Sequence, residues 1–127
     1  MTGTCSLLLL EDEPLILMDL EFAAEDLGCK AFCASDIAGA LRVLNGEERI
    51  DAAVLDVTLR DGETCVPVAR ELDARGIPYL LHSGDRNRKN ETVRELGVPH
   101  IPKPANPQTV IQKAIDLTQH TPAGEVG

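Results

Sequence analysis

The sequence predicts an α/β fold in which a parallel sheet of five strands carries helices on both faces. Short apolar runs alternate with segments of helical periodicity along the chain, and each such pair is typical of a strand followed by a helix. The 127 residues suit one compact domain. Hydrophobic residues make up 43% of the chain and charged residues 26%, so the composition is that of an ordinary globular protein.

The first strand and its helix are predicted before residue 29. Residues 6–10 form a continuous apolar run, as expected for a strand that is buried on both faces. Pro14 suits the first turn of a helix, where its missing N–H costs nothing, and Gly28 is expected to end that helix. The predicted buried stripe of the helix consists of Ile16, Leu20, Ala23 and Leu27.

The second unit and the third strand follow directly. Residues 30–34 predict a strand, and Ser35 or Asp36 is expected to cap the helix after it. The apolar stripe of that helix consists of Ile37, Ala40, Leu41 and Leu44. The third strand is predicted at residues 52–55, and it ends on Asp56.

The rest of the chain predicts two more strands and three helices. The strands cover residues 79–82 and 100–101. The helices are marked first by Cys65, Val68, Ala69 and Leu72, then by Val93 and Leu96, and last by Val110, Ile111, Ala114 and Leu117. Asn106 and Pro107 are a strong cap and first-turn pair for the last helix.

These strand–helix units restrict the topology of the sheet. Crossover connections between parallel strands are right-handed, and chains of this length commonly adopt the flavodoxin-like, doubly wound order 2-1-3-4-5. We expect the domain to cover residues 1–120. Residues 121–127 contain proline and glycine without apolar periodicity, which predicts a disordered tail.

The charge of the chain argues against several classes of partner. A net charge of −9 opposes binding to DNA or RNA, and aromatic residues, which stack on single strands, are only 2% of the chain. The apolar run at residues 6–10 is too short to span a bilayer and follows no basic segment, so we predict a cytoplasmic protein without membrane contact. The cysteines match no zinc spacing and are interpreted as small hydrophobes: Cys5, Cys29, Cys33 and Cys65.

Polar residues gather where the predicted strands end. Glu11, Asp12 and Glu13 follow the first strand, Asp56 ends the third, Ser83 and Gly84 follow the fourth, and Lys103 follows the fifth. Ligands of open parallel sheets bind outside these carboxyl ends. Residues that are far apart in the sequence therefore converge on one site if the predicted order is right.

The residue types at this edge suit a phosphoryl group and a magnesium ion. Neighbouring carboxylates repel one another unless a cation lies between them, and carboxylate oxygens are ligands that Mg²⁺ prefers. Lys103 offers a compact positive charge and Ser83 a hydroxyl group, while Gly84 allows a backbone N–H to approach closely. Asp56 is the central carboxylate and the predicted nucleophile, because a carboxylate can carry a phosphoryl group as an acyl phosphate.

Four short motifs resemble the signature of bacterial two-component response-regulator receiver domains. They are Leu10-Glu11-Asp12-Glu13-Pro14, Leu55-Asp56-Val57, Ser83-Gly84 and Lys103-Pro104. The resemblance covers about residues 5–119 and implies a stand-alone receiver that is phosphorylated on Asp56. It implies that Asp12, Asp56 and the carbonyl group of Thr58 bind Mg²⁺ directly, and that Glu11 acts through a metal-bound water. It also implies that the phosphoryl group is held by Thr58, Ser83, Gly84 and Lys103.

The chain departs from the family pattern near the acceptor and on the last strand. Leu59 and Arg60 stand where receivers often have methionine and proline, and Asp61-Gly62 is expected to supply the turn. His100 stands three residues before Lys103, where the family usually has an aromatic switch residue. We therefore expect a switch through Ser83 and His100, in which His100 follows the serine less fully than an aromatic ring would.

The resemblance also implies partners. A sensor histidine kinase or a histidine phosphotransfer protein would supply the phosphoryl group, and the chain would be a phosphoacceptor rather than an enzyme. No output domain is expected after the last helix, so the signal would leave through protein contact or onward phosphotransfer from a monomer or weak homodimer. A second apolar line on the first helix fits either a kinase-docking surface or an extension of the core: Leu15, Met18 and Phe22.

Other functions fit parts of the pattern. The main alternative is a pseudo-receiver that docks proteins without being phosphorylated. A phosphatase of the haloacid-dehalogenase type needs a second aspartate two residues after the nucleophile, where this chain has Thr58. A flavin or nucleotide binder needs a phosphate loop after the first strand, where the carboxylates of Glu11, Asp12 and Glu13 would repel phosphate.

Overall fold

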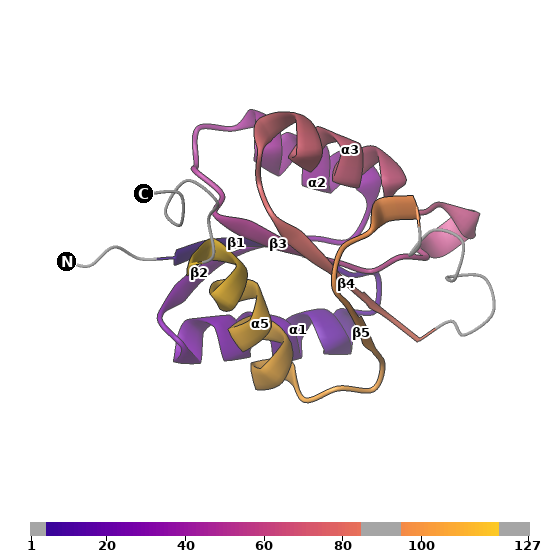
Figure 1. Ribbon diagram of the computed structural model, residues 1–127. Coiled ribbons are helices and arrows are strands. Elements are labelled where there is room, and N and C mark those ends of the chain that lie inside the picture. Colours follow the sequence, from indigo (N-terminus) through magenta and orange to yellow (C-terminus); the bar gives the residue numbers. More distant parts are fainter. Residues whose placement is uncertain (1–4, 85–94, 120–127) are drawn as a thin grey trace.

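The computed structural model describes residues 5–84 and 95–119, which form a parallel sheet between two layers of helices (Figure 1). The strands are β1 (Cys5–Leu10), β2 (Cys29–Ala34), β3 (Ala52–Leu55), β4 (Tyr79–Ser83) and β5 (His100–Pro102). All neighbouring strands are parallel and their order is β2-β1-β3-β4-β5. The predicted fold class and strand order are therefore confirmed.

The helices cover the two faces of the sheet in pairs. They are α1 (Pro14–Asp26), α2 (Ile37–Asn45), α3 (Val66–Arg75) and α5 (Pro107–Gln119), with a short 3-10 helix, η1 (Arg60–Gly62), after β3. Figure 1 shows α1 and α5 on one face and α2 and α3 on the other. Val93 of the fourth predicted helix and the predicted tail at residues 121–127 lie outside the described residues, whereas Leu96 of that helix is described and packs against the core layer of α2 and α3.

The predicted caps begin the helices as expected. The side chain of Asp36 accepts a hydrogen bond from the backbone N–H of Gly39 at 2.8 Å, and Asn106 accepts one from Gln108 at 2.8 Å. Each cap supplies a partner to an N–H group that the helix itself cannot pair. Gly76, directly after α3, has a φ of 72°, a left-handed conformation that favours glycine at the end of a helix.

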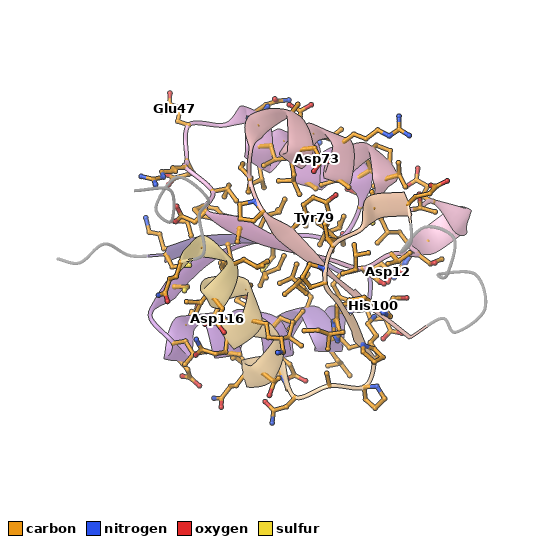
Figure 2. The ribbon with its side chains drawn as sticks, viewed as in Figure 1. Asp12, Glu47, Asp73, Tyr79, His100 and Asp116 are labelled. Atoms are coloured by element: carbon orange, nitrogen blue, oxygen red, sulfur yellow. The ribbon has the colours of Figure 1, made fainter. Side chains whose placement is uncertain are left out.

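The core has two parts because each central strand is buried on both faces. Leu8 and Leu10 of β1 pack with the α2 and α3 layer, whereas Leu7 and Leu9 pack with the α1 and α5 layer. All four side chains are at most 1% exposed, and each contributes roughly 2 kcal/mol of hydrophobic free energy when fully buried. Tyr79 of β4 lies between the sheet and α3 (Figure 2). The core thus packs the sheet against both helix layers and fixes where the carboxyl ends of its strands lie.

Helix α1 buries one narrow stripe and leaves a second apolar line exposed. Leu20, Ala23 and Ala24 are buried, but Leu27 is 38% exposed because it is the residue that ends the helix, so its predicted burial is wrong. The exposed fractions along the second line are 71% for Leu15, 41% for Met18 and 54% for Phe22. These side chains do not extend the core. Among the described residues, no helix has the length and apolar character needed to cross a bilayer.

Candidate functional site

Backbone hydrogen bonds bring the ends of the strands together. The N–H of Asp56 donates to the carbonyl oxygen of Leu10 at 2.9 Å, and the N–H of Glu11 donates to that of Ala34 at 3.0 Å. On the far side of the sheet, the N–H of Lys103 donates to the carbonyl oxygen of Ser83 at 3.0 Å. The hydrogen-bond ladders thus continue one residue past the strands and position the backbone of the polar residues there.

Three carboxyl groups converge at this edge, as the sequence predicts. Ligand oxygens of Glu11, Asp12 and Asp56 all lie within 4.8 Å of one another. Glu11 is 1% exposed and Asp56 is 4% exposed, whereas Asp12 is half-buried. Figure 2 shows Asp12 at the end of the molecule opposite to Glu47. Carboxylates this close and this poorly hydrated repel one another strongly.

Lys103 offsets part of this negative charge. Its Nζ lies 2.9 Å from Oε1 of Glu11 and 3.6 Å from Oδ2 of Asp56. The other oxygen of Glu11 accepts a hydrogen bond from the N–H of Glu13 at 3.1 Å. Glu11 is thus held by both of its oxygens, and one ammonium group is shared between two carboxylates.

The pKa shifts of Asp56 and Lys103 indicate that the lysine offsets only part of the negative charge of the cluster. Burial, followed by the negative charge of Glu11, raises the pKa of Asp56 to about 8, even though Lys103 acts in the opposite direction. Burial alone would lower the pKa of Lys103, but its hydrogen bond to Glu11 and the nearby carboxylates raise it instead. The lysine is therefore firmly protonated, and the cluster still favours a further cation.

The donor set fits a magnesium ion. Carboxylate oxygens that meet at a buried edge are hard ligands, and Mg²⁺ usually takes one or two of them together with water and phosphate oxygens. Glu11, Asp12 and Asp56 supply such oxygens. A Mg²⁺ ion bound by these residues would relieve the repulsion from Glu11, which together with burial raises the pKa of Asp56.

The remaining predicted residues surround the carboxyl groups on neighbouring loops. Ser83 is buried at the end of β4. Gly84 packs against Lys103 so closely that an added Cβ would lie 3.3 Å from the Cβ of the lysine, which explains glycine at this position. Thr58 is exposed and pairs with Thr64 in a short antiparallel bridge beside Asp56. The peptide bond between Lys103 and Pro104 is cis.

His100 lies on the strand next to Ser83 and outside the carboxylate cluster. It is opposite Leu81, and Pro102 is opposite Ser83, so side chains at positions 81, 83, 100 and 102 face the same side of the sheet. His100 is half-buried at the same end of the molecule as Asp12 (Figure 2). Its position suits a residue that responds to Ser83, whereas the response itself stays a prediction.

Two residues near the site escape prediction from the sequence. Arg60 donates from Nη2 to the carbonyl oxygen of Asp12 at 3.4 Å and so links the loop after β3 to the loop after β1. His82 is 4% exposed and lines a cavity of about 240 Å³ together with Lys103 and Pro104. A histidine inside the apolar run of β4 was the available signal, since alternating residues of a central strand face two buried layers.

Solved structures match this fold over nearly its whole length, although no protein-family model and no curated protein matches the chain. A CheY-like response regulator receiver domain protein from Methanospirillum hungatei JF-1 is 20% identical, with a TM-score of 0.81 over 98% of this chain and 100% of that one. A response regulator receiver protein from Sinorhizobium medicae WSM419 is 25% identical, with a TM-score of 0.77 over 93% and 97%. SdrG from Sphingomonas melonis Fr1 is 38% identical, with a TM-score of 0.74 over 94% and 99%.

The chain belongs to the response-regulator receiver domains. This family places it in phosphorelay signalling in general. The receiver domain differs from the usual pattern after Asp56, where Leu59 is buried and its N–H donates to the carbonyl oxygen of Glu63 at 2.7 Å. Gly62, with a φ of 77°, completes the turn that the sequence predicts there.

Proposed function

We propose that the receiver domain accepts a phosphoryl group on Asp56 from a sensor histidine kinase or a histidine phosphotransfer protein, in a Mg²⁺-dependent reaction. The observation that carries this proposal is the single ammonium group of Lys103, which is shared between the carboxylates of Glu11 and Asp56 at the carboxyl edge of the sheet. In the proposed roles, the nucleophile Asp56 and the metal-binding carboxylate Glu11 both contact the ammonium group of Lys103, which would bind the phosphoryl group.

The chain's own residues divide the work of the transfer. An oxygen of Asp56 attacks phosphorus, the bond from phosphorus to the donor nitrogen breaks, and the electron pair of that bond leaves with the donor imidazole. Lys103, the Ser83 hydroxyl and the N–H at Gly84 would hold the transferred oxygens. Glu11, Asp12, Asp56 and the carbonyl group of Thr58 would hold Mg²⁺, which when bound neutralises negative charge between the donor and the carboxylates.

Incubation with acetyl phosphate tests this proposal directly. In the presence of Mg²⁺, we expect intact mass spectrometry to show one added phosphoryl group, and we expect none when EDTA replaces the metal. A domain that stays unlabelled at every donor concentration, yet is folded, would instead support the phosphorylation-independent docking module. We propose that the domain is a phosphoacceptor that assists its own phosphorylation and dephosphorylation, so the protein and then water, which releases inorganic phosphate, should be the only acceptors of the phosphoryl group.

Millimolar Mg²⁺ is expected to raise the melting temperature of the receiver domain, because a ligand that binds only the folded state stabilises it by mass action. The Asp12→Ala variant should lose this shift, since it lacks one of the converging carboxylates. Glu47→Gln is a matched control, because Glu47 is exposed at the opposite end of the molecule and its replacement should leave the shift unchanged (Figure 2). An equal shift in all three proteins would contradict metal binding at the cluster.

The exposed apolar line on α1 is the proposed docking surface for the phosphodonor protein. Leu15 is 71% exposed in the first turn after Glu11, Asp12 and Glu13, so a partner seated on it would reach the carboxylate cluster. Exposed apolar side chains in a row are typical of a surface that a partner covers.

Leu15→Glu is therefore expected to slow phosphotransfer from a phosphorylated histidine kinase at least tenfold while leaving labelling by acetyl phosphate unchanged. Leu27→Glu is the matched control, because it makes the same change at the other end of α1, far from the site. Radiolabel transfer followed on gels measures both rates. If the two variants slow the kinase reaction equally, the effect comes from added charge and the docking surface lies elsewhere.

The output of the receiver domain is proposed to pass through Ser83 and His100. The phosphoryl group would carry about two negative charges in place of the single charge of the Asp56 carboxylate, and the hydroxyl group of Ser83 would then turn towards them. His100 faces the same side of the neighbouring strand and would follow that movement. The downstream receiver of the signal is proposed to be a protein, which the domain would contact as a monomer or weak homodimer.

A further inference from the structure

Two cysteines lie directly opposite each other at the amino end of the sheet. In the parallel pairing of β1 with β2, Cys5 is the register partner of Cys29. Both side chains belong to the layer that packs against α1 and α5, so they face the same side of the sheet. Neighbouring strands are about 4.8 Å apart, and a disulfide needs a Cα separation of roughly 4.4–6.8 Å. The sheet thus sets the backbone of this pair at a distance that a disulfide can span.

The other two cysteines are not placed for such a bond. Cys33 is opposite Leu9, and it follows Cys29 by four residues on the same strand, which is roughly 13 Å in an extended chain. Cys65 belongs to the core layer on the other face of the sheet. The chain therefore has one pair of cysteines, and two that serve as internal controls.

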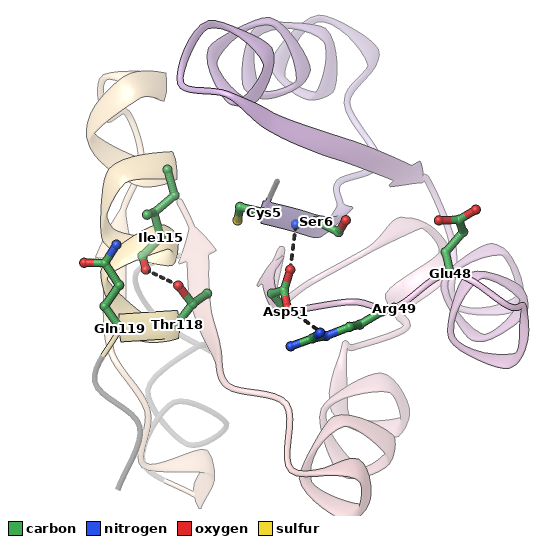
Figure 3. A pocket seen from close by; sticks show the side chains of 8 residues that line it. All are labelled: Cys5, Ser6, Glu48, Arg49, Asp51, Ile115, Thr118 and Gln119. Carbon is green, nitrogen blue, oxygen red and sulfur yellow. Dashed lines mark hydrogen bonds and ion pairs between the residues drawn. The ribbon is translucent and has the colours of Figure 1, made fainter. Parts of the chain in front are cut away.

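The two thiols of the pair differ in their access to solvent. Cys5 is half-buried and lines an open pocket of about 480 Å³ between the start of β1 and the end of α5 (Figure 3). Cys29 is 5% exposed and lies next to Cys5 on the neighbouring edge strand, β2. A small reagent can therefore reach Cys5 first, and Cys29 is in position to react with the product.

We propose that Cys5 and Cys29 form a reversible redox site, in which a low-molecular-weight disulfide such as oxidised glutathione converts the two thiols to an intramolecular disulfide. The Cys5 thiol loses its proton to solvent and its sulfur attacks one sulfur of the small disulfide, which releases one thiolate. The Cys29 thiol then loses its proton, and its sulfur attacks the Cys5 sulfur of the mixed disulfide and releases the second thiolate; the two released thiolates take up the two protons. The two cysteines are oxidised and the small disulfide is reduced to two thiols.

The surroundings of Cys5 make this reaction slow at neutral pH. Burial, the hydrogen bond and charge of Cys29, and the charge of Asp51 raise the pKa of Cys5 to about 12. Asp51 is fixed close by, since it accepts a hydrogen bond from the N–H of Ser6 at 2.8 Å and pairs with Arg49 (Figure 3). The attacking thiolate is therefore scarce, and oxidation should accelerate as the pH rises.

The bond would close a loop that contains all of α1. This loop runs from Cys5 to Cys29, and it leaves the carboxylate cluster at the other end of β1 untouched. Closing a loop reduces the freedom of the unfolded chain, so the oxidised domain should melt at a higher temperature. The site acts on stability independently of phosphorylation on Asp56.

The primary structure makes the test sharp, because trypsin cuts after lysine and arginine and the first such residue is Lys30. The full chain is incubated with excess oxidised glutathione at pH 8.5, blocked with iodoacetamide and digested. We expect peptide 1–30 to lose two hydrogen atoms and to carry no alkyl group, while the peptides with Cys33 and Cys65 are alkylated. The melting temperature should rise by several degrees and return after dithiothreitol.

Two variants separate this mechanism from simple thiol reactivity. Cys29→Ala should stop at the mixed disulfide and show one glutathione on Cys5, whereas Cys33→Ala should form the same bond in peptide 1–30 as the parent. Alkylation of both Cys5 and Cys29 after prolonged oxidation of the parent would overturn the proposal. So would a bond that joins peptide 1–30 to the peptide of Cys33 or Cys65, or a dimer linked between chains.

Discussion

Asp56→Asn should abolish labelling by acetyl phosphate completely while leaving the domain folded. The amide has almost the same shape as the carboxylate but is a far weaker nucleophile, so no acyl phosphate can form. The substitution also removes a buried group that is costly to ionise, since burial and Glu11 raise the pKa of Asp56 to about 8. We therefore expect the metal-free variant to be at least as stable as the parent above pH 8.

Intact mass spectrometry and thermal melts check both parts of this result. Asp73→Asn is the matched control, because Asp73 lies on α3, away from the cluster, and its replacement should not change the labelling (Figure 2). Labelling of the Asp56→Asn variant at the rate of the parent would place the acceptor at another residue and remove the basis of the proposed function.

The stability of the metal-free domain should contain a component that disappears as the pH falls from 6.5 towards 4. His82 is buried, and neither ring nitrogen has a hydrogen-bond partner among the described residues. Burial, followed by the positive charges of Lys103 and His100, lowers the pKa of His82 from 6.5 to about 4. Because the folded pKa is the lower one, protons bind the unfolded chain more tightly in this window. The loss amounts to about 3 kcal/mol of unfolding free energy and is complete below pH 4.

The titration of Asp56 changes the unfolding free energy in the opposite direction, so the effect of His82 has to be measured in a protein that lacks this carboxyl group. Its raised pKa means that protonation between pH 8 and 3.8 stabilises the folded state. We therefore compare Asp56→Asn with Asp56→Asn/His82→Leu in urea melts at each pH. Leucine fills a similar volume without polar atoms, and the difference between the two proteins should grow in favour of leucine as the pH falls. A difference that is constant with pH would show that His82 is not buried as a neutral ring.

Most of the sheet could be predicted because its signals are local. A continuous apolar run such as residues 6–10 predicts a strand without knowledge of what packs against it. The cap at Asp36 and the pair of Asn106 and Pro107 predict the starts of helices in the same way. The convergence of Glu11, Asp12, Asp56 and Lys103 then follows from the strand order. The distances between these side chains cannot be predicted from the strand order, because side-chain contacts depend on packing.

The features that escaped prediction all depend on distant parts of the chain. The exposure of Leu15, Met18 and Phe22 decides between the two interpretations that the sequence left open, because apolar spacing alone does not show whether another element packs against that line of α1. The contact of Arg60 with the carbonyl group of Asp12 joins loops 48 residues apart in the sequence. His82 is buried because β5 and α1 cover it. A histidine at the same place in an edge strand would be exposed to solvent.

The exposed apolar line on α1 also has a colloidal consequence. At neutral pH the net charge of −9 keeps copies of the domain apart, so three large apolar side chains can face water without causing association. The isoelectric point is about 4.7, and near that pH the repulsion vanishes while the apolar surface remains. Solutions of the domain should therefore turn cloudy around that pH at high concentration, and Leu15→Glu should delay the clouding. We expect crystals grown near this pH to use the same surface as a contact between copies, because the net charge that separates them is then close to zero.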